Sequence, residues 1–209
     1  DAVSGKLVWE KKLAIEKVLP SLIEGLVVEK GIVYAGSGKG LCAIDVKSGN
    51  EIWRNKDWNQ NQGSTATMSL DNGVLISSSH WGALYGNDAA TGKKLWSMEK
   101  NGIRHRSSSA VMQGNVFYLA SDESLFLMET KTGRILMQKK LPFSVNVASS
   151  PLVTDKELIF GTASEGIVAL DRETWTEKWR YRTGESMIYT APYSRNPSAT
   201  VEASPVQVG

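Results

Sequence analysis

The sequence has very little of the residues that build disulfides and metal sites. It contains one cysteine, Cys42, and two histidines, His80 and His105, among 209 residues. A single cysteine excludes an intrachain disulfide and a cysteine-rich metal site, and it says nothing about the redox compartment. No ladder of carboxylates resembles a calcium-binding loop. We therefore expect Cys42 to be a buried structural thiol and expect no metal site.

Long apolar runs and blocks of like charge are also missing. The longest apolar runs, 26–28 and 31–35, fall far short of the ~20 residues that a membrane-spanning helix needs. Lys and Arg number 24 against 22 Asp and Glu, and the charges are spread singly. The sequence thus has no basic footprint for nucleic acid or an anionic membrane. Residues 1–5 lack the features of a signal peptide, so either a signal was removed or the chain is cut from a longer protein.

What the sequence does contain is an internal repeat. An acidic residue is followed by Ser or Thr, Gly and then Trp, and the element begins at positions 1, 45, 88, 129 and 171, in steps of 44, 43, 41 and 42 residues. In the two weaker copies Met137 replaces the Trp and Trp175 replaces the Gly. Propeller blades of four strands have periods of ~40–50 residues. The period therefore predicts propeller blades.

Each period also holds short β-rich runs bounded by turns. The turn at 71–73, Asp-Asn-Gly, supplies residues that tolerate positive φ, as tight hairpins require. No long stretch with a 3.6-residue apolar period competes with this pattern. In the last full period we expect strands at 149–153, 158–162, 166–171 and 177–181, joined by hairpins. The sequence thus predicts an all-β fold of four-stranded antiparallel blades.

The segment 43–53, Ala-Ile-Asp-Val-Lys-Ser-Gly-Asn-Glu-Ile-Trp, resembles the tryptophan-docking motif of the pyrroloquinoline-quinone-like (PQQ-like) β-propeller family. The carboxylate can accept hydrogen bonds from the turn amides, Gly can take the left-handed conformation, and the Trp ring can be buried against the neighbouring blade. In that family the motif is structural, which implies that its residues hold blades together. They are Asp45, Gly49, Trp53, Asp88, Gly92, Trp96, Asp171 and Trp179.

The resemblance implies one partial propeller over residues 1–209. We expect an outer strand at 1–13, blades at 14–56, 57–100, 101–140 and 141–183, and a long loop with the first strand of the next blade at 184–209. The family usually closes its ring with seven or eight blades, so we expect further residues beyond Gly209. A ring made of two chains and an unusually small ring are the alternatives. Open blade edges would favour self-association.

Ligands in related propellers bind on the face formed by the loops between the second and third strands of each blade and between successive blades. The Arg104-His105-Arg106 cluster on one such loop suits an anionic or carbonyl ligand, and a solvated loop is the alternative. Trp58 and Trp81 are candidates to stack on a sugar or peptide ring. The two histidines lie in different blades, which argues against a histidine-rich metal site. The candidate binding residues are Trp81, His105, Arg106, Asn146, Tyr189 and Arg195.

The repeat breaks once, after the fourth blade. Pro151 is followed by Pro192 after 41 residues and by the better-matching Pro205 after 54. In the second register residues 187–197 form a long loop on the ligand-binding face, and long ordered loops are often functional. In the first register Pro192 begins a strand instead.

The resemblance leaves two classes of function open. Binding or scaffold relatives serve outer-membrane protein assembly, form sensor-kinase ectodomains or are attached to a phosphoesterase. Quinoprotein dehydrogenases need PQQ, calcium and an aspartate base, commonly beside a cysteine pair that the single Cys42 rules out. We expect a non-catalytic, periplasmic or secreted propeller without cofactors that recognises protein or carbohydrate and no nucleic acid. Part of a PQQ- and calcium-dependent alcohol or sugar dehydrogenase is the alternative.

Overall fold

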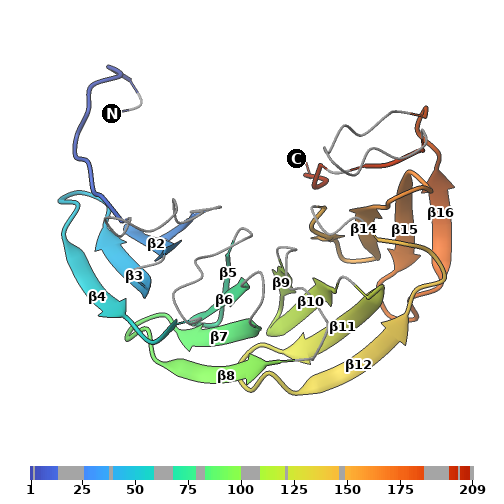
Figure 1. Ribbon diagram of the computed structural model, residues 1–209, viewed down its shortest axis with the longest axis horizontal. Helices are drawn as coiled ribbons and strands as arrows, with labels where there is room; N and C mark the ends of the chain where they lie inside the picture. Colours follow the sequence, from blue (N-terminus) through green and yellow to red (C-terminus); the bar gives the residue numbers. More distant parts are fainter. Residues whose placement is uncertain are drawn as a thin grey trace, which may run out of the picture.

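The computed structural model describes residues 1, 3–13, 26–37, 40–58, 68–78, 83–99, 109–120, 122–145, 149–185, 198–201 and 203–207. Within these ranges the chain forms four antiparallel sheets of four strands each, set side by side in an open arc (Figure 1). The strands of every sheet follow one another in chain order, and no α-helix occurs among the described residues. The predicted all-β propeller of four-stranded blades is confirmed.

In each blade the first strand lies at the inner edge of the arc, and the following strands succeed one another toward the outer edge (Figure 1). Blade 1 consists of β1 (Val27–Glu29), β2 (Ile32–Ser37), β3 (Gly40–Asp45) and β4 (Glu51–Asn55). Blade 2 consists of β5 (Ser69–Asp71), β6 (Val74–Ser78), β7 (Leu84–Asp88) and β8 (Lys94–Met98). Blade 3 consists of β9 (Ala110–Met112), β10 (Asn115–Leu119), β11 (Ser124–Glu129) and β12 (Ile135–Lys140). Blade 4 consists of β13 (Leu152–Val153), β14 (Glu157–Gly161), β15 (Ile167–Asp171) and β16 (Glu177–Tyr181).

The same pairing irregularity recurs between the third and fourth strand of every blade. In blade 1 the register shifts between Ala43 and Ile44, just before the acidic residue of the repeat. A bulge of this kind bends the strand and increases its twist. The equivalent shifts lie at Gly86/Asn87, Leu127/Met128 and Ala169/Leu170. The blades therefore share this backbone irregularity as well as the repeated sequence element.

The apolar core lies between blades. Successive side chains of a strand point to opposite faces of its sheet. In β10, Val116 and Tyr118 join side chains of blade 2, whereas Phe117 and Leu119 join side chains of blade 4. The cluster between blades 1 and 2 includes Tyr34 and Tyr85. Blades 2 and 3 are thus buried on both faces by neighbouring blades, and their stability depends on those neighbours.

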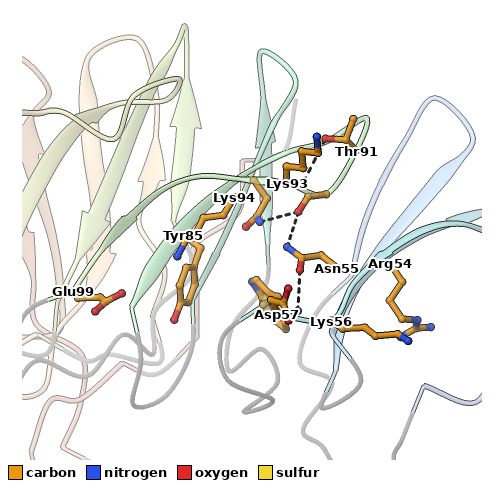
Figure 2. Close-up of a pocket in the computed structure, with 12 residues that line it drawn as sticks. Arg54, Asn55, Lys56, Asp57, Tyr85, Thr91, Lys93, Lys94 and Glu99 are labelled. Atoms are coloured by element: carbon orange, nitrogen blue, oxygen red, sulfur yellow. Dashed lines mark hydrogen bonds between the residues drawn. The ribbon is translucent and has the colours of Figure 1, made fainter.

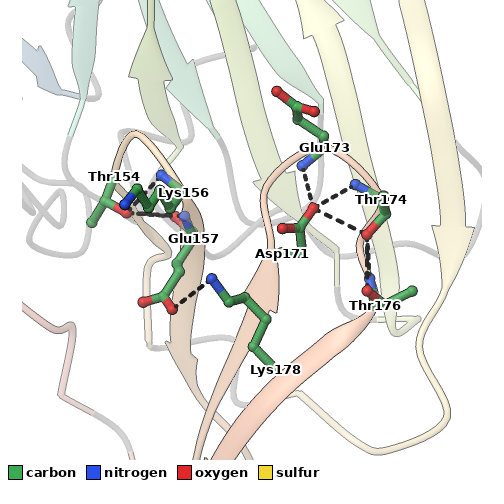
Figure 3. A network of polar contacts seen from close by, with 8 residues as sticks. All are labelled: Thr154, Lys156, Glu157, Asp171, Glu173, Thr174, Thr176 and Lys178. Carbon is green, nitrogen blue, oxygen red and sulfur yellow. Dashed lines mark hydrogen bonds and ion pairs between the residues drawn. The ribbon is translucent and has the colours of Figure 1, made fainter.

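The acidic residue that begins each turn between the third and fourth strands fixes that turn. In blade 1, Asp45 Oδ1 accepts hydrogen bonds from Ser48 N at 2.7 Å and Ser48 Oγ at 2.8 Å. These bonds stabilise the carboxylate, so the pKa of Asp45 is held below its ordinary value. Figure 3 shows the same arrangement in blade 4, where Asp171 Oδ1 accepts from Thr174 N at 2.9 Å and Thr174 Oγ1 at 3.0 Å. The pKa of Asp171 is lowered for the same reason.

The glycine of each regular turn receives a tryptophan from the preceding blade. Gly92 has φ +75°, and a Cβ at this position would lie 2.5 Å from the ring of Trp53. The indole of Trp53 also donates from Nε1 to Ala89 O at 3.1 Å. Because glycine has no side chain and tolerates positive φ, the indole can approach the turn closely. The same pair of contacts joins Trp9 to Gly49 and Val46 O, and Trp96 to Gly133 and Thr130 O.

At the junction between blades 3 and 4, the large aromatic residue is in the turn and not in the outer strand of the preceding blade. Met137 occupies the tryptophan position, and Trp175 occupies the glycine position with φ +54°. Trp175 N still donates to Asp171 O at 2.9 Å, which preserves the turn. The Trp175 side chain is 1% exposed, in the apolar cluster against which Met137 packs. A bulky residue at positive φ is strained, and burial of the ring offsets that strain. The large side chain here comes from the opposite side of the junction.

A further side chain strengthens these junctions. Two positions after the tryptophan position, a side-chain nitrogen donates to the carbonyl of the turn residue in the next blade. These contacts join Lys11 to Gly49 at 3.4 Å, Asn55 to Gly92 at 2.8 Å and Lys139 to Trp175 at 2.7 Å. Gly49 and Gly92 are therefore held both through their close approach to a ring and through their carbonyl oxygens.

Two residues of the C-terminal segment contact the residues just before the inner strand of blade 4. Ser149 Oγ donates to Ala203 O at 3.0 Å, and Ser150 N donates to Ser204 Oγ at 2.9 Å. Both bonds join residues 54 positions apart, which is the spacing of the register that begins at Pro205. These contacts agree in spacing with that register, and the assignment of residues 203–208 to a following blade stays a prediction.

The segments expected as strands at the two chain ends are not regular strands. Residues 6–12 are extended and are held by Trp9, whose Nε1 donates to Val46 O at 2.6 Å. Residues 203–207 also form no strand. A strand requires a backbone ladder with a neighbour, and no described residue supplies one to either segment. The predicted loop at 187–197, including Pro192, lies outside the described residues.

Replacing Gly92 tests the docking contact. Gly92→Ala adds a Cβ at φ +75° and a clash with Trp53, whereas Gly73→Ala adds a Cβ at the same φ with nothing within 4 Å. We expect the control, Gly73→Ala, to lower the free energy of unfolding by about 1 kcal/mol. Gly92→Ala should lower it by about 3 kcal/mol because overpacking is added. Urea denaturation measures both, and equal losses would contradict the docking.

The exchanged junction predicts strong coupling between Met137 and Trp175. Met137→Trp alone places two indoles in one space, and Trp175→Gly alone leaves a cavity. Each should lower the free energy of unfolding by about 2–4 kcal/mol. The double variant restores the partners of the other junctions, so it should recover about 2 kcal/mol or more relative to the sum of the single losses. Urea denaturation of the four proteins measures this coupling, and simple additivity would refute the exchange.

Candidate functional site

The predicted site residues divide into two groups in the structure. Trp81, His105, Arg106, Asn146, Tyr189 and Arg195 lie outside the described residues, so their role in binding remains a prediction. The predicted structural residues all lie within the described ranges, in the turns and outer strands of the blades. Trp53 and Trp96 dock on a following blade, whereas Trp179 on the outer strand of blade 4 is 39% exposed.

A groove of about 790 Å³ lies between the outer parts of blades 1 and 2 (Figure 2). One wall is formed by residues 54–58, at the end of β4 and just after it. The other wall is formed by β7, by the turn 91–93 that follows it and by the first residue of β8. The docking of Trp53 on Gly92 brings these walls together. The groove is therefore a product of the blade junction.

Asn55 connects the two walls of the groove. Its Nδ2 donates to Gly92 O at 2.8 Å, and its Oδ1 accepts from Asp57 N at 2.9 Å (Figure 2). Both ends of the amide are thereby used within the protein. Asn55 has a structural role, because it holds the chain after β4 against the turn of blade 2.

Asn87 is a buried amide with one unused acceptor. Its Nδ2 donates to Gly92 O at 3.1 Å, its side chain is 1% exposed, and its Oδ1 has no partner among the described residues. Because Gly92 O can only accept a hydrogen bond, the amide nitrogen of Asn87 must face it. Oδ1 is therefore the amide atom that has no hydrogen-bond partner among the described residues. An unpaired buried polar atom costs about 1–3 kcal/mol. Asn87 lines the groove, so its acceptor suits a donor brought by a ligand.

The repeat contains a signal for Asn87 that motif analysis missed. The residue just before the acidic turn residue is apolar and buried in the other blades, where it is Ile44, Met128 or Leu170. Only a comparison of this position across blades reveals the polar exception. Asn87 differs from its counterparts and is therefore not part of the recurring motif.

Cationic side chains outnumber acidic ones around the groove. Lys56 belongs to the wall from blade 1, and Lys93 and Lys94 belong to the wall from blade 2 (Figure 2). All three are exposed, and no ion pair with another described residue involves them. The acidic lining residues are Asp57 and Glu99. The groove therefore presents exposed ammonium groups on both walls.

Arg54, which also lines the groove, forms an ion pair with Glu51. Arg54 Nε donates to Glu51 Oε1 at 3.0 Å, and a second guanidinium nitrogen contacts Glu51 Oε2. These hydrogen bonds lower the pKa of Glu51 and raise the pKa of Arg54. The lysines, rather than Arg54, are the cations that remain for a ligand.

The aromatic rings of the groove belong to the core. Trp58 is 2% exposed, and its Nε1 donates to Ser77 Oγ at 3.0 Å. A Cβ at Gly36 would lie 2.3 Å from the Trp58 ring, so the ring is pressed against that backbone. Tyr85 is 6% exposed in the same apolar cluster. The hypothesis that Trp58 stacks on a sugar or peptide ring is therefore wrong, since its faces are covered.

The described residues hold no group of three or more His, Cys, Asp or Glu placed to bind a metal ion. Cys42 is fully buried, and its Sγ lies 3.5 Å from Ala35 O. Burial raises the pKa of the Cys42 thiol, which disfavours the thiolate. Across the same described ranges, no helix has the length and apolar character to cross a membrane.

The unpaired acceptor predicts that Asn87→Leu stabilises the protein. Leu is similar in shape to Asn and stands at the equivalent position in blade 4, and Asn55 still donates to Gly92 O. We expect the free energy of unfolding to rise by about 1 kcal/mol. Asn55→Leu is the matched control and should lower it by a similar amount, because it leaves Asp57 N without its acceptor. A loss of stability in Asn87→Leu, measured by urea denaturation, would show that Oδ1 is already satisfied.

Comparison with curated proteins finds relatives that are much longer than this chain. The dehydrogenase subunit of the quinone-dependent alcohol dehydrogenase of Gluconobacter oxydans is 27% identical over 152 residues, which cover 61% of this chain and 20% of that protein. The tetrathionate hydrolase of Acidithiobacillus ferrooxidans is 25% identical over 140 residues, covering 66% of this chain and 26% of that protein. The chain thus spans only about a fifth to a quarter of these relatives.

Solved structures share the fold at low identity. The BamB protein of Moraxella catarrhalis superposes with a TM-score of 0.63 and 18% identity, over 76% of this chain and 49% of that one. The quinohemoprotein alcohol dehydrogenase of Comamonas testosteroni superposes with a TM-score of 0.62 and 19% identity, over 84% of this chain and 39% of that one. At these identities the likeness shows the propeller architecture alone.

A family model covers nearly the whole sequence. The model described as outer membrane protein assembly factor BamB matches residues 1–99 and again residues 80–208. Its two overlapping matches agree with the repeat of the blades, and the predicted resemblance to PQQ-like repeats is confirmed. The chain belongs to the PQQ-like propeller family described as outer membrane protein assembly factor BamB.

Proposed function

We propose that this chain forms a propeller of an extracytoplasmic protein that binds other proteins and holds them in an assembly without catalysing a reaction. The observation that carries the proposal is the family match, which spans residues 1–99 and 80–208 and whose description is that of an assembly factor. The same description, which refers to the outer membrane, supports a location outside the cytoplasm and makes outer-membrane assembly proteins the partners to test first.

The architecture supports a scaffold. Every described blade is interlocked with a neighbour through docked indoles and carbonyl contacts, as in the pair Trp53 and Gly92. Such a framework can hold loops in fixed positions relative to one another, and binding residues are often found on loops carried by a rigid scaffold. The loop residues predicted from the sequence, including His105, Arg106, Tyr189 and Arg195, are therefore the first candidates for contact with a partner.

A second candidate function is a part of a quinone-dependent alcohol dehydrogenase. It is favoured by relatives of that name, which are 25–27% identical to this chain. PQQ and calcium would supply the redox chemistry of such an enzyme. The described residues do not fit this site, because they gather no set of metal-binding side chains and Cys42 has no cysteine partner. We derive no catalytic step from them.

A pull-down with matched variants tests the proposed function. The immobilised protein is exposed to a detergent extract of the cell envelope. One variant carries His105→Ala, Arg106→Ala, Tyr189→Ala and Arg195→Ala, at loop residues predicted from the sequence to contact a partner. The control carries Lys131→Ala and Glu173→Ala in exposed turns between third and fourth strands. We expect a specific protein to be retained by the wild type and the control, and lost from the loop variant.

Three results would count against this proposal. Retention of no protein would contradict a binding function, and equal retention by all variants would contradict the loop assignment. The catalytic alternative is tested in parallel by adding PQQ and calcium with an alcohol and a redox dye. Reduction of the dye would favour the dehydrogenase and overturn the proposal of a non-catalytic propeller.

A further inference from the structure

The groove between blades 1 and 2 has the chemistry of a binding site for an anion. Lys56 stands on one wall and Lys93 and Lys94 on the other (Figure 2), and none of the three is paired with an acidic side chain among the described residues. Ammonium groups on both walls attract a ligand whose carboxylates extend to either side. A single small anion would meet only part of this surface in a space of about 790 Å³.

Asn87 adds a requirement for a hydrogen-bond donor. Its Oδ1 is buried and unpaired among the described residues, and the residue itself is part of the lining of the same groove. The amide cannot turn over to satisfy this atom, because its Nδ2 is held by Gly92 O. The ligand should therefore offer N–H or O–H groups between its carboxylates.

These two requirements are met together by a peptide with acidic side chains. Its backbone supplies N–H groups at regular intervals, and Asp or Glu side chains supply the carboxylates. An acidic sugar also has hydroxyls and carboxylates, but sugar rings favour exposed aromatic faces, and the groove has none because Trp58 and Tyr85 are 2% and 6% exposed. The observations thus favour a peptide over a polysaccharide.

We infer that the groove between blades 1 and 2 binds an extended acidic segment of a partner protein, with Lys56, Lys93 and Lys94 contacting its carboxylates and Asn87 accepting a hydrogen bond from it. This inference rests on the proposed protein-binding function and assigns it a second set of contact residues, different from the loop residues predicted from the sequence. It also gives the unpaired acceptor of Asn87 a role, since binding surfaces commonly retain polar groups that lower stability.

Fluorescence anisotropy with defined peptides tests the inference. The probe is a short fluorescein-labelled peptide of alternating Glu and Ser, and the reference peptide has Gln in place of every Glu. We expect the wild-type protein to bind the Glu–Ser peptide more tightly than the Gln–Ser peptide. Raising the salt concentration should weaken binding, because the lysines are exposed to solvent.

Three variants locate the binding. Lys56→Glu with Lys93→Glu reverses one charge on each wall and should weaken Glu–Ser binding about tenfold or more. Lys47→Glu with Lys131→Glu makes the same change of charge at exposed turn lysines away from the groove, and should leave binding close to that of the wild type. Asn87→Leu should weaken binding about fivefold while thermal stability is kept or raised.

Each possible outcome decides the inference. Equal binding by the two lysine-pair variants, or no preference for Glu over Gln, would overturn it. Tighter binding of an oligogalacturonate than of the Glu–Ser peptide, measured in the same assay, would replace the peptide by an acidic sugar. If the groove variants have no effect while the envelope pull-down still retains a partner, the groove assignment fails alone. If neither experiment detects binding, the proposed function fails with it.

Discussion

The close approach of an indole to a glycine turn is the contact on which the rest of this structure depends. At Gly92 a Cβ would lie 2.5 Å from the Trp53 ring, so this site has room for hydrogen alone. The acidic residue before the glycine shapes the turn, and the indole Nε1 binds a carbonyl beside it, as Trp53 does with Ala89 O. Because the apolar core lies between blades, this contact also sets how closely their faces pack.

The groove follows from the same contact. The α-carbon of Gly92 faces the ring of Trp53, and its carbonyl oxygen accepts hydrogen bonds from the side-chain amides of Asn55 and Asn87. The carbonyl of Gly92 thus binds a side chain from each wall of the groove. Because Asn87 uses its nitrogen for this contact, its oxygen has no donor among the described residues. A structural junction and a polar cleft share their central residue, so changes at Gly92 would alter both stability and the shape of the groove.

The repeat predicted most of the fold and little of the candidate site. Recurring residues such as Asp45 and Trp53 indicated the blades, their turns and the all-β class, because each has a fixed geometric task in every copy. The groove escaped prediction because Lys56, Lys93 and Lys94 are ordinary surface residues in sequence. The burial of Asn87 and the missing partner of its Oδ1 among the described residues are properties of the folded structure and could not be predicted from the sequence. Regular strands were predicted near the chain ends, where no described residue pairs with the backbone, since local propensity does not report a neighbour.

The exchanged junction of Met137 and Trp175 has a consequence for the order of the blades. Each regular junction joins an indole to a glycine, so on these contacts alone one blade could replace another. Blade 4 carries its bulky ring on the turn, and it would collide with any blade that presents a tryptophan. Blade 3, which presents a methionine, would leave a void against a glycine turn. Met137 and Trp175 therefore fit each other and not the partners of the regular junctions, which disfavours packing of blade 3 or blade 4 against a wrong neighbour.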